Sequence, residues 1–187
     1  MAHRVVVLAS GSGTLLQALL DHHGPDVEIV AVGSDKPGAT ALDRARRAGV
    51  ATFVEPLGSG SDRDAWDARL AEAVARHQPD LVVCAGFMRI LGPAFLARFG
   101  GRTINSHPSL LPSFPGAHAP RDALAHGVKV SGTTVFVVDE GVDTGPILAQ
   151  RAVEVAADDT VETLHERIKV EERQLLVTVV DDLARPT

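Results

Sequence analysis

A continuous apolar run near the start of the chain limits the possible folds more than any other feature of the sequence. After Arg4, residues 5–9 are all apolar, which is typical of a central parallel strand that helices cover on both faces. A glycine-rich loop, Ser10-Gly-Ser-Gly13, comes next, and leucines then recur at helical spacing from Leu15 to Leu20. This order of strand, loop and helix predicts a phosphate-binding loop, because free loop N–H groups and the helix dipole both attract an anion.

The glycine loop departs from the dinucleotide-binding pattern. Leu16 stands where the third glycine of that fingerprint would fall, which argues against NAD as a ligand. A tight strand-to-helix turn with nothing bound is the alternative interpretation of the loop.

Strand-like and helix-like segments alternate along the rest of the chain. Asp159 followed by Glu162 resembles a capping box at the start of the last helix. The alternation predicts an α/β fold, with a doubly wound and mostly parallel sheet flanked by helices. A length of 187 residues fits one domain covering residues 1–187. The expected strands are 4–9, 27–33, 51–54, 80–85, 103–104, 130–138 and 147–155, and the expected helices are 15–20, 39–48, 62–77, 119–126 and 159 onwards.

Composition limits the classes of partner. The formal net charge of -6 argues against nucleic acid, which is usually bound by a basic face. The single cysteine, Cys84, leaves no internal disulfide and suits a reducing compartment. No apolar run approaches the roughly 20 residues of a membrane helix, and the first apolar run is too short for a signal peptide. We therefore expect a cytoplasmic protein with small-molecule partners, no nucleic acid and no membrane contact.

A proline-rich segment after the strand at 103–104 carries two candidate catalytic residues. Residues two apart on an extended chain point to the same side, so Asn105 and His107 are expected to reach one cleft. Pro108, Pro112 and Pro115 stiffen the loop that follows. In the alternative interpretation, Asn105 caps a turn and His107 packs against a proline.

A third candidate, Asp143, follows the strand expected at 130–138. A carboxylate beside an imidazole fixes its tautomer and favours the protonated ring. Asn105, His107 and Asp143 together could donate protons and stabilise an oxyanion. We expect the glycine loop, the loop from Gly86 and the loops carrying these three residues to share one sheet edge, since all follow carboxyl ends of expected strands.

Two charged side chains occupy unfavourable helical positions. Glu172 falls on the apolar stripe of the last helix, four residues after Ile168 and three before Leu175, where an acid needs a partner. Arg63 lies in the first turn of a helix, where a cation opposes the dipole. Each is either a tolerated surface residue or one held there to meet a ligand.

Four segments together resemble the phosphoribosylglycinamide formyltransferase family, from about Arg4 to the last helix. The resemblance implies a Rossmann-like formyltransferase fold and an enzyme of purine biosynthesis and one-carbon metabolism. Such a transferase moves a formyl group from the cosubstrate 10-formyltetrahydrofolate to the amine of glycinamide ribonucleotide. It needs no metal and works as a monomer or homodimer. The segments are Ser10-Gly-Ser-Gly13, Ala85-Gly-Phe-Met-Arg-Ile-Leu91, Asn105-Ser-His-Pro-Ser-Leu-Leu-Pro112 and Asp143-Thr-Gly-Pro146.

The resemblance also implies roles for individual residues. Asn105, His107 and Asp143 form the catalytic group. The ribonucleotide is bound by Gly11, Ser12, Gly13, Thr14 and Leu15 at its phosphate and by Glu172 at its ribose or amine. The folate site consists of Arg63, Met88, Arg89, Ile90, Leu91, Asp139, Glu140, Gly141 and Val142, continuing to Asp143.

The chain departs from the family pattern in two places. Family members often have Ser-Asn after the second glycine, whereas this chain has Thr14-Leu15. Backbone contacts to a phosphate survive this change, but an asparagine side-chain contact does not. Many relatives also continue past the last helix into a further strand or hairpin.

Three alternatives share part of this pattern. Methionyl-tRNA formyltransferase and formyltetrahydrofolate deformylase have the same Asn-x-His-x-Ser-Leu-Leu-Pro loop, but each is expected to carry a further domain for which 187 residues leave no room. A non-enzymatic nucleotide-binding module would use only the glycine loop and would leave Asn105, His107 and Asp143 unexplained. A formyl-transfer assay with glycinamide ribonucleotide separates these possibilities.

Overall fold

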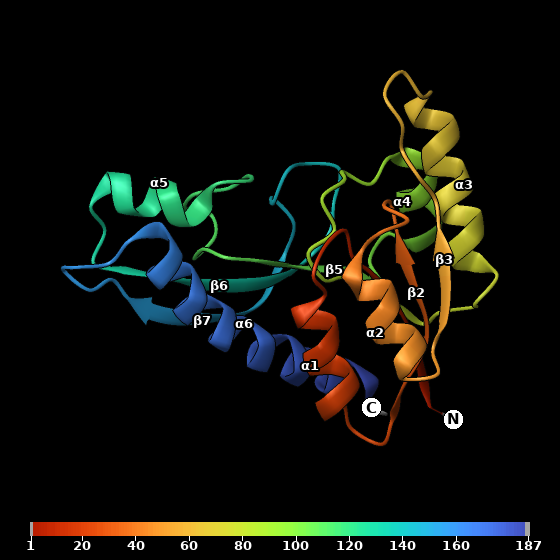
Figure 1. The fold of residues 1–187 in the computed structure, drawn as a ribbon, viewed down its shortest axis with the longest axis horizontal. Coiled ribbons are helices and arrows are strands. Elements are labelled where there is room, and N and C mark those ends of the chain that lie inside the picture. Colours follow the sequence, from red (N-terminus) through yellow and green to blue (C-terminus); the bar gives the residue numbers. More distant parts are fainter. Residues whose placement is uncertain (1, 186–187) are drawn as a thin grey trace.

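Seven strands form one sheet in the order β3-β2-β1-β4-β5-β6-β7 (Figure 1). The computed structural model describes residues 2–185. The first five strands run parallel to one another, and β6 and β7 form an antiparallel hairpin beside β5. The doubly wound, mostly parallel sheet is thereby confirmed. The strands are β1 His3–Leu8, β2 Val27–Ser34, β3 Ala51–Val54, β4 Leu81–Cys84, β5 Thr103–His107, β6 Val130–Val137 and β7 Ile147–Glu154.

The described part of the chain has six helices, which pack around the sheet (Figure 1). Helices α1, α2 and α6 pack on one face, and α3 and α4 pack on the other. Helix α5 lies against α6 beside the hairpin. Within residues 2–185, no helix combines the length and the apolar character needed to span a bilayer. The helices are α1 Thr14–His22, α2 Thr40–Arg47, α3 Arg63–Ala75, α4 Pro93–Phe99, α5 Ala119–His126 and α6 Val161–Ala184.

Strand β1 is buried on both faces, as its continuous apolar sequence predicts. Val5 and Val7 belong to the core under α1, α2 and α6, whereas Val6 and Leu8 belong to the core under α3 and α4. All four side chains are fully buried. Because a strand alternates its side chains between the two faces, only an unbroken apolar run satisfies both cores.

The long helix α6 begins at a different cap from the one expected. Thr160 is the N-cap, and it exchanges hydrogen bonds with Thr163 in a capping box. The expected pairing of Asp159 with Glu162 is therefore wrong. The Asp159 carboxylate instead accepts from the backbone N–H of Ala156 and from the Thr163 hydroxyl, and it pairs with Arg167.

The antiparallel direction of β6 overturns one expectation about the loops. Val137, the last residue of β6, lies beside Ile104 near the start of β5. The loop that carries Asp143 therefore leaves the sheet at the opposite end of β5 from His107. It must travel back roughly 10 Å, the length of three extended residues, to reach His107.

Helix α4 has no counterpart in the expectations from sequence, because seven residues are too few to show a periodic pattern. Its start is held by Asp67, which lies on the neighbouring helix α3 and is buried. The two carboxylate oxygens of Asp67 accept from the backbone N–H groups of Gly92 at 2.6 Å and Phe95 at 2.9 Å. A side chain from another helix thus accepts the hydrogen bonds that an N-cap residue would usually accept.

Replacing Asp67 by alanine is expected to lower the free energy of unfolding by about 2 kcal/mol, because two N–H groups at the start of α4 lose their acceptor. Denaturant unfolding measures the change. Asp67→Asn keeps one acceptor oxygen and should lose less. An alanine variant as stable as the wild type would show that α4 forms without this cap.

Candidate active site

A cavity of about 610 Å³ opens where β1, β4 and β5 end. Its walls come from the loops that follow these strands, from the loop between β6 and β7, and from one side of α6. The volume falls in the range of about 300–1,000 Å³ that is typical of small-molecule sites. The cavity therefore lies at the sheet edge where open α/β folds bind their ligands.

Most residues singled out from the sequence line this cavity. Two of them do not: Glu140 is exposed outside it, and Arg63 lies beneath the loop after β4. There the Arg63 guanidinium donates to the carbonyl oxygen of Ile90 at 2.6 Å and stacks over Trp66. Those that line the cavity are Gly11, Ser12, Gly13, Thr14, Leu15, Met88, Arg89, Ile90, Leu91, Asn105, His107, Asp139, Gly141, Val142, Asp143 and Glu172.

The polar side chains of β5 alternate between the two faces of the strand. Ser106 faces α6, where its hydroxyl donates to Glu172 Oε1 at 2.6 Å. Asn105 and His107 lie on the other side of the strand and line the cavity. The Asn105 amide makes no side-chain hydrogen bond within residues 2–185. Its donors and acceptor are therefore available to a ligand.

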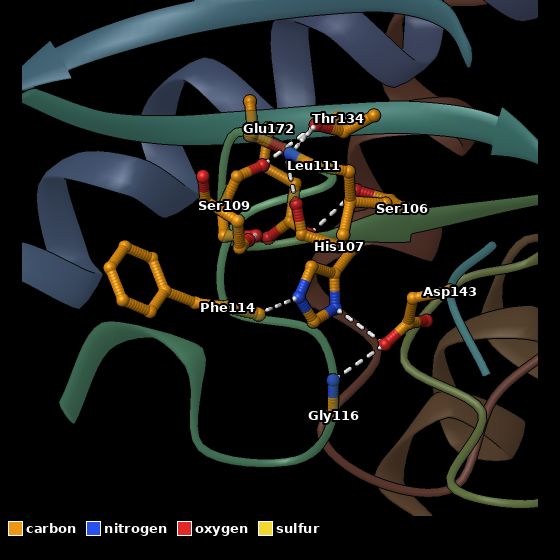
Figure 2. A network of polar contacts seen from close by, with 11 residues as sticks. Ser106, His107, Ser109, Leu111, Phe114, Gly116, Thr134, Asp143 and Glu172 are labelled. Atoms are coloured by element: carbon orange, nitrogen blue, oxygen red, sulfur yellow. Dashed lines mark hydrogen bonds and ion pairs between the residues drawn. The ribbon is translucent and has the colours of Figure 1, made fainter. Parts of the chain in front are cut away.

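The His107 ring lies between two oxygen acceptors (Figure 2). Its Nε2 atom is 2.8 Å from the carbonyl oxygen of Phe114, which can only accept, so Nε2 carries a proton. Its Nδ1 atom is 3.5 Å from Asp143 Oδ2, farther than a good N–H···O hydrogen bond. The ring is 7% exposed and the carboxylate 13% exposed. Nδ1 therefore faces the Asp143 carboxylate at a distance that leaves it without a good hydrogen bond.

Asp143 joins the two loops that the sequence could not connect. Its Oδ2 atom also accepts from the backbone N–H of Gly116 at 2.7 Å, so it holds the proline-rich loop as well as facing His107 (Figure 2). Its φ of 56° lies in the left-handed region, which is uncommon for a residue other than glycine. Nearby Gly145 passes so close to the Val137 carbonyl that a Cβ would lie 1.8 Å from its oxygen. The loop between β6 and β7 is thus tightly constrained.

Glu172 is an acid enclosed by the protein. Only 5% of the residue is exposed, as its position on the apolar stripe of α6 predicts. Burial raises the pKa of its carboxyl above the usual range, while the Ser106 hydrogen bond and the nearby His107 ring work in the opposite direction. The carboxyl therefore borders the cavity in an environment that favours its protonated form.

The glycine loop turns its carbonyl groups away from the cavity. The carbonyl oxygen of Gly11 accepts from the backbone of Ala41, and that of Ser12 accepts from Arg44 Nε at 2.8 Å. Gly13 adopts a φ of 71°, and a Cβ there would lie 2.7 Å from the Cα of Ala41. Glycine is required at this position, both for its backbone angle and for the close approach of α2.

Because these carbonyl groups bind α2, the backbone N–H groups at the start of α1 remain available to a ligand in the cavity. The first hydrogen bond inside the helix is donated by Gln17 to Gly13. The N-cap residue, Gly13, offers no side chain to the preceding N–H groups. These donors and the positive end of the helix dipole form an anion site.

The structure adds cavity residues that the sequence reasoning missed. Lys169 lines the cavity from α6, and it lies three residues before Glu172 on the same helical face. That spacing was the signal available in the sequence. Ser106 stands between Asn105 and His107, and strand alternation predicts that its side chain lies on the opposite face, toward α6. Within residues 2–185, no group of three or more potential ligand side chains is arranged to hold a metal.

The chain is similar to proteins of one kind over nearly its whole length. Residues 3–180 match the family described as formyl transferase. The phosphoribosylglycinamide formyltransferase of Mycobacterium tuberculosis is 58% identical over 97% of this chain and 85% of its own length. That of Escherichia coli is 40% identical over 94% and 84%, respectively. The crystal structure of glycinamide ribonucleotide transformylase 1 from Symbiobacterium toebii superposes with a TM-score of 0.94 and 45% identity, covering 98% of this chain and 88% of the other.

Replacing Glu172 by glutamine is expected to stabilise the protein at pH 7, because the amide has no charge to bury and can still accept from Ser106. A carboxyl whose pKa is raised by folding binds its proton more tightly in the folded state. Stability of the wild-type protein therefore falls as the pH rises from the ordinary glutamate value of 4.5 through the raised pKa.

The gain from Glu172→Gln should consequently be small below pH 4 and should grow toward neutral pH. Denaturant unfolding at several pH values measures it. A gain that does not depend on pH, or a loss of stability at pH 7, would show that the buried charge of Glu172 does not destabilise the protein.

Proposed function

This chain belongs to the formyl transferase family, and we propose that it transfers a formyl group from 10-formyltetrahydrofolate to the amine of glycinamide ribonucleotide in purine biosynthesis. The products are formylglycinamide ribonucleotide and tetrahydrofolate. One observation carries the proposal: Asn105, His107 and Asp143 meet in a single cavity, between a phosphate-type loop and an apolar loop. The site thus joins a place for each substrate to groups that can assist acyl transfer.

The loop from Gly86 to Leu91 suits a folate. Met88 and Ile90 are 68% and 55% exposed at the cavity, and Val142 adds a third exposed apolar side chain. Exposed apolar surface beside free backbone groups matches a flat heterocycle with polar edges. We assign the folate to this part of the cavity, where the formyl group it supplies can reach Asn105 and His107.

The glycine loop and α6 suit the ribonucleotide. Backbone N–H groups from Ser12 to Leu15 provide the anion site, and the Lys169 cation on the facing helix can add a charge-assisted contact to the phosphate. Glu172 can accept from a ribose hydroxyl or from the amine. A ligand donor would offset its burial, so Glu172→Gln should bind the ribonucleotide more weakly although it unfolds less readily.

The catalytic groups act on charge and on protons. As the amine adds to the formyl carbonyl, negative charge develops on the carbonyl oxygen. The Asn105 amide and protonated His107 can donate hydrogen bonds to it, each worth roughly 3–4 kcal/mol in comparable sites. Asp143 keeps the imidazole oriented and compensates its charge. His107 can then give its proton to the leaving nitrogen and take up the proton that the amine loses.

We infer that the protein works in the cytoplasm on small molecules, as a monomer or a homodimer. The net charge of -6 and the single cysteine support this setting. A metal has no part in the steps above, all of which use side chains and backbone groups already in the cavity.

The proposed function is tested by measuring formyl transfer from 10-formyltetrahydrofolate to glycinamide ribonucleotide. Asp143→Asn should lower kcat by about 100-fold or more, because it removes the carboxylate that orients the His107 ring and compensates its charge during proton transfer. The dissociation constants of both substrates should change by less than about threefold, since the stabilised charge develops mainly in the transition state.

Asp158→Asn is a matched control, because it removes the charge of an exposed aspartate in the turn before α6. It should transfer at the wild-type rate. A wild-type protein that binds both substrates but transfers no formyl group would refute the proposal. Full activity in Asp143→Asn would refute the role of the carboxylate.

Gly13→Val should weaken ribonucleotide binding by at least about tenfold and leave folate binding within about twofold. The new side chain would displace α2 from the loop and misalign the N–H donors. Calorimetry with each substrate measures both effects. Gly38→Val is the control, because a Cβ at Gly38 meets open space. Equal losses for the two substrates would place the phosphate elsewhere.

A further inference from the structure

Asp35 is a fully buried acid to which the mechanism gives no role. It follows the last residue of β2, and its side chain is 0% exposed. Its Oδ2 atom accepts from Arg89 Nε at 2.6 Å, and within residues 2–185 its buried Oδ1 atom has no hydrogen-bond partner. Arg89 also supplies the only ion pair of this carboxylate among those residues.

This pairing makes each side chain dependent on the other. A buried carboxylate is strongly unfavourable without a counter-charge, and removing one partner of such a pair exposes the full desolvation penalty of the other. Arg89 is 31% exposed and reaches down from the loop after β4. The guanidinium of Arg89 therefore compensates the negative charge of Asp35.

Arg89 is the central residue of that loop, and it borders the cavity while its guanidinium reaches Asp35. Phe87 and Leu91 are buried on either side of it, and Phe87 stacks on Trp66. Met88 and Ile90, the residues between, are exposed at the cavity. Because the side chains alternate, contacts that fix residues 87, 89 and 91 also set the positions of the exposed Met88 and Ile90 side chains.

Two other hydrogen bonds hold the backbone of the loop, each from a different segment. The Ser10 hydroxyl accepts from the N–H of Met88 at 2.8 Å, and Arg63 donates to the Ile90 carbonyl at 2.6 Å. Neither contact involves the Arg89 side chain. Apolar packing of Ala31 with Phe87 and Leu91 also joins β2 to the loop, and the Asp35–Arg89 pair is the polar contact between them within residues 2–185.

We propose that Asp35 is a positioning residue for the folate cosubstrate, acting through Arg89 on the loop of residues 87–91. This inference rests on the proposed function. Asp35 does not itself line the cavity. Its effect should therefore appear in folate affinity, and leave ribonucleotide affinity and the chemical step unchanged.

Asp35→Ala is expected to raise the KM for 10-formyltetrahydrofolate, and the Kd for tetrahydrofolate measured by calorimetry, by about tenfold. The KM for glycinamide ribonucleotide, and kcat with both substrates saturating, should stay within about twofold. Asp35→Asn keeps an acceptor for Arg89 without the charge and should show a smaller increase. Should the alanine variant not fold, the asparagine variant carries the same expectation of a selective rise.

A double-mutant cycle identifies the route of the effect. Arg89 also lines the cavity, so Arg89→Met should weaken folate binding at least as much as Asp35→Ala, and the two changes combined should be no worse than Arg89→Met alone. Asp181→Asn is the matched control. It alters another aspartate that accepts from a backbone N–H, that of Gly24, remote from the loop. Its folate KM should equal that of the wild type.

Two results would overturn the inference while the wild-type protein is active. One is a folate KM unchanged in both Asp35 variants. The other is a parallel loss of affinity for both substrates with a lower melting temperature, which would indicate a general structural role. A wild-type protein that fails to transfer the formyl group would instead remove the proposed function, and the inference with it.

Discussion

Strand β5 is bonded to a parallel strand on one side and to an antiparallel strand on the other, and the site depends on this position. Its carboxyl end projects past Cys84, the last residue of β4, so Ser106 and His107 extend beyond the parallel part of the sheet. Alternation then places His107 and Ser106 on opposite faces of the strand; both border the cavity, and Ser106 also bonds Glu172 of α6. The antiparallel neighbour β6 supplies the loop that brings Asp143 back to His107. A parallel strand at this place would have needed a long crossover before that loop.

The polar groups of the site are held in arrangements that reduce stability. Asp143 has a left-handed backbone, and Glu172 is a buried acid whose pKa is raised by burial. Such features persist where the surrounding structure fixes them, and they are common at functional sites. Here the Gly116 N–H and the Ser106 hydroxyl hold the two carboxylates. Both contacts cross between segments distant in sequence, so folding of the whole chain is needed to assemble them.

Features set by local sequence could be predicted, and features set by distant contacts could not. The burial of β1 and of Glu172 follows from apolar periodicity, and the turn from β1 to α1 follows from its glycines; the structure agrees with these three features. Sequence alone does not identify the cap of α6, because Asp159 and Thr160 are both good capping residues and only the backbone conformation decides between them. Helix α4 depends on Asp67 from another helix, and the direction of β6 depends on strand pairing. Neither is encoded in the neighbouring residues. The position of Asn105, His107 and Asp143 together was predicted, but for a partly wrong reason, since the Asp143 loop leaves the opposite end of β5.

The central claim is that one cavity holds both substrates, with the catalytic groups between them. A crystal structure with glycinamide ribonucleotide and tetrahydrofolate bound together tests it most directly. The account predicts the phosphate at the N–H groups of residues 12–15 and the folate ring against residues 88–91. It also predicts the amine within hydrogen-bonding distance of Asn105 or His107. Ligands in separate cavities, or a phosphate bound away from the glycine loop, would contradict it.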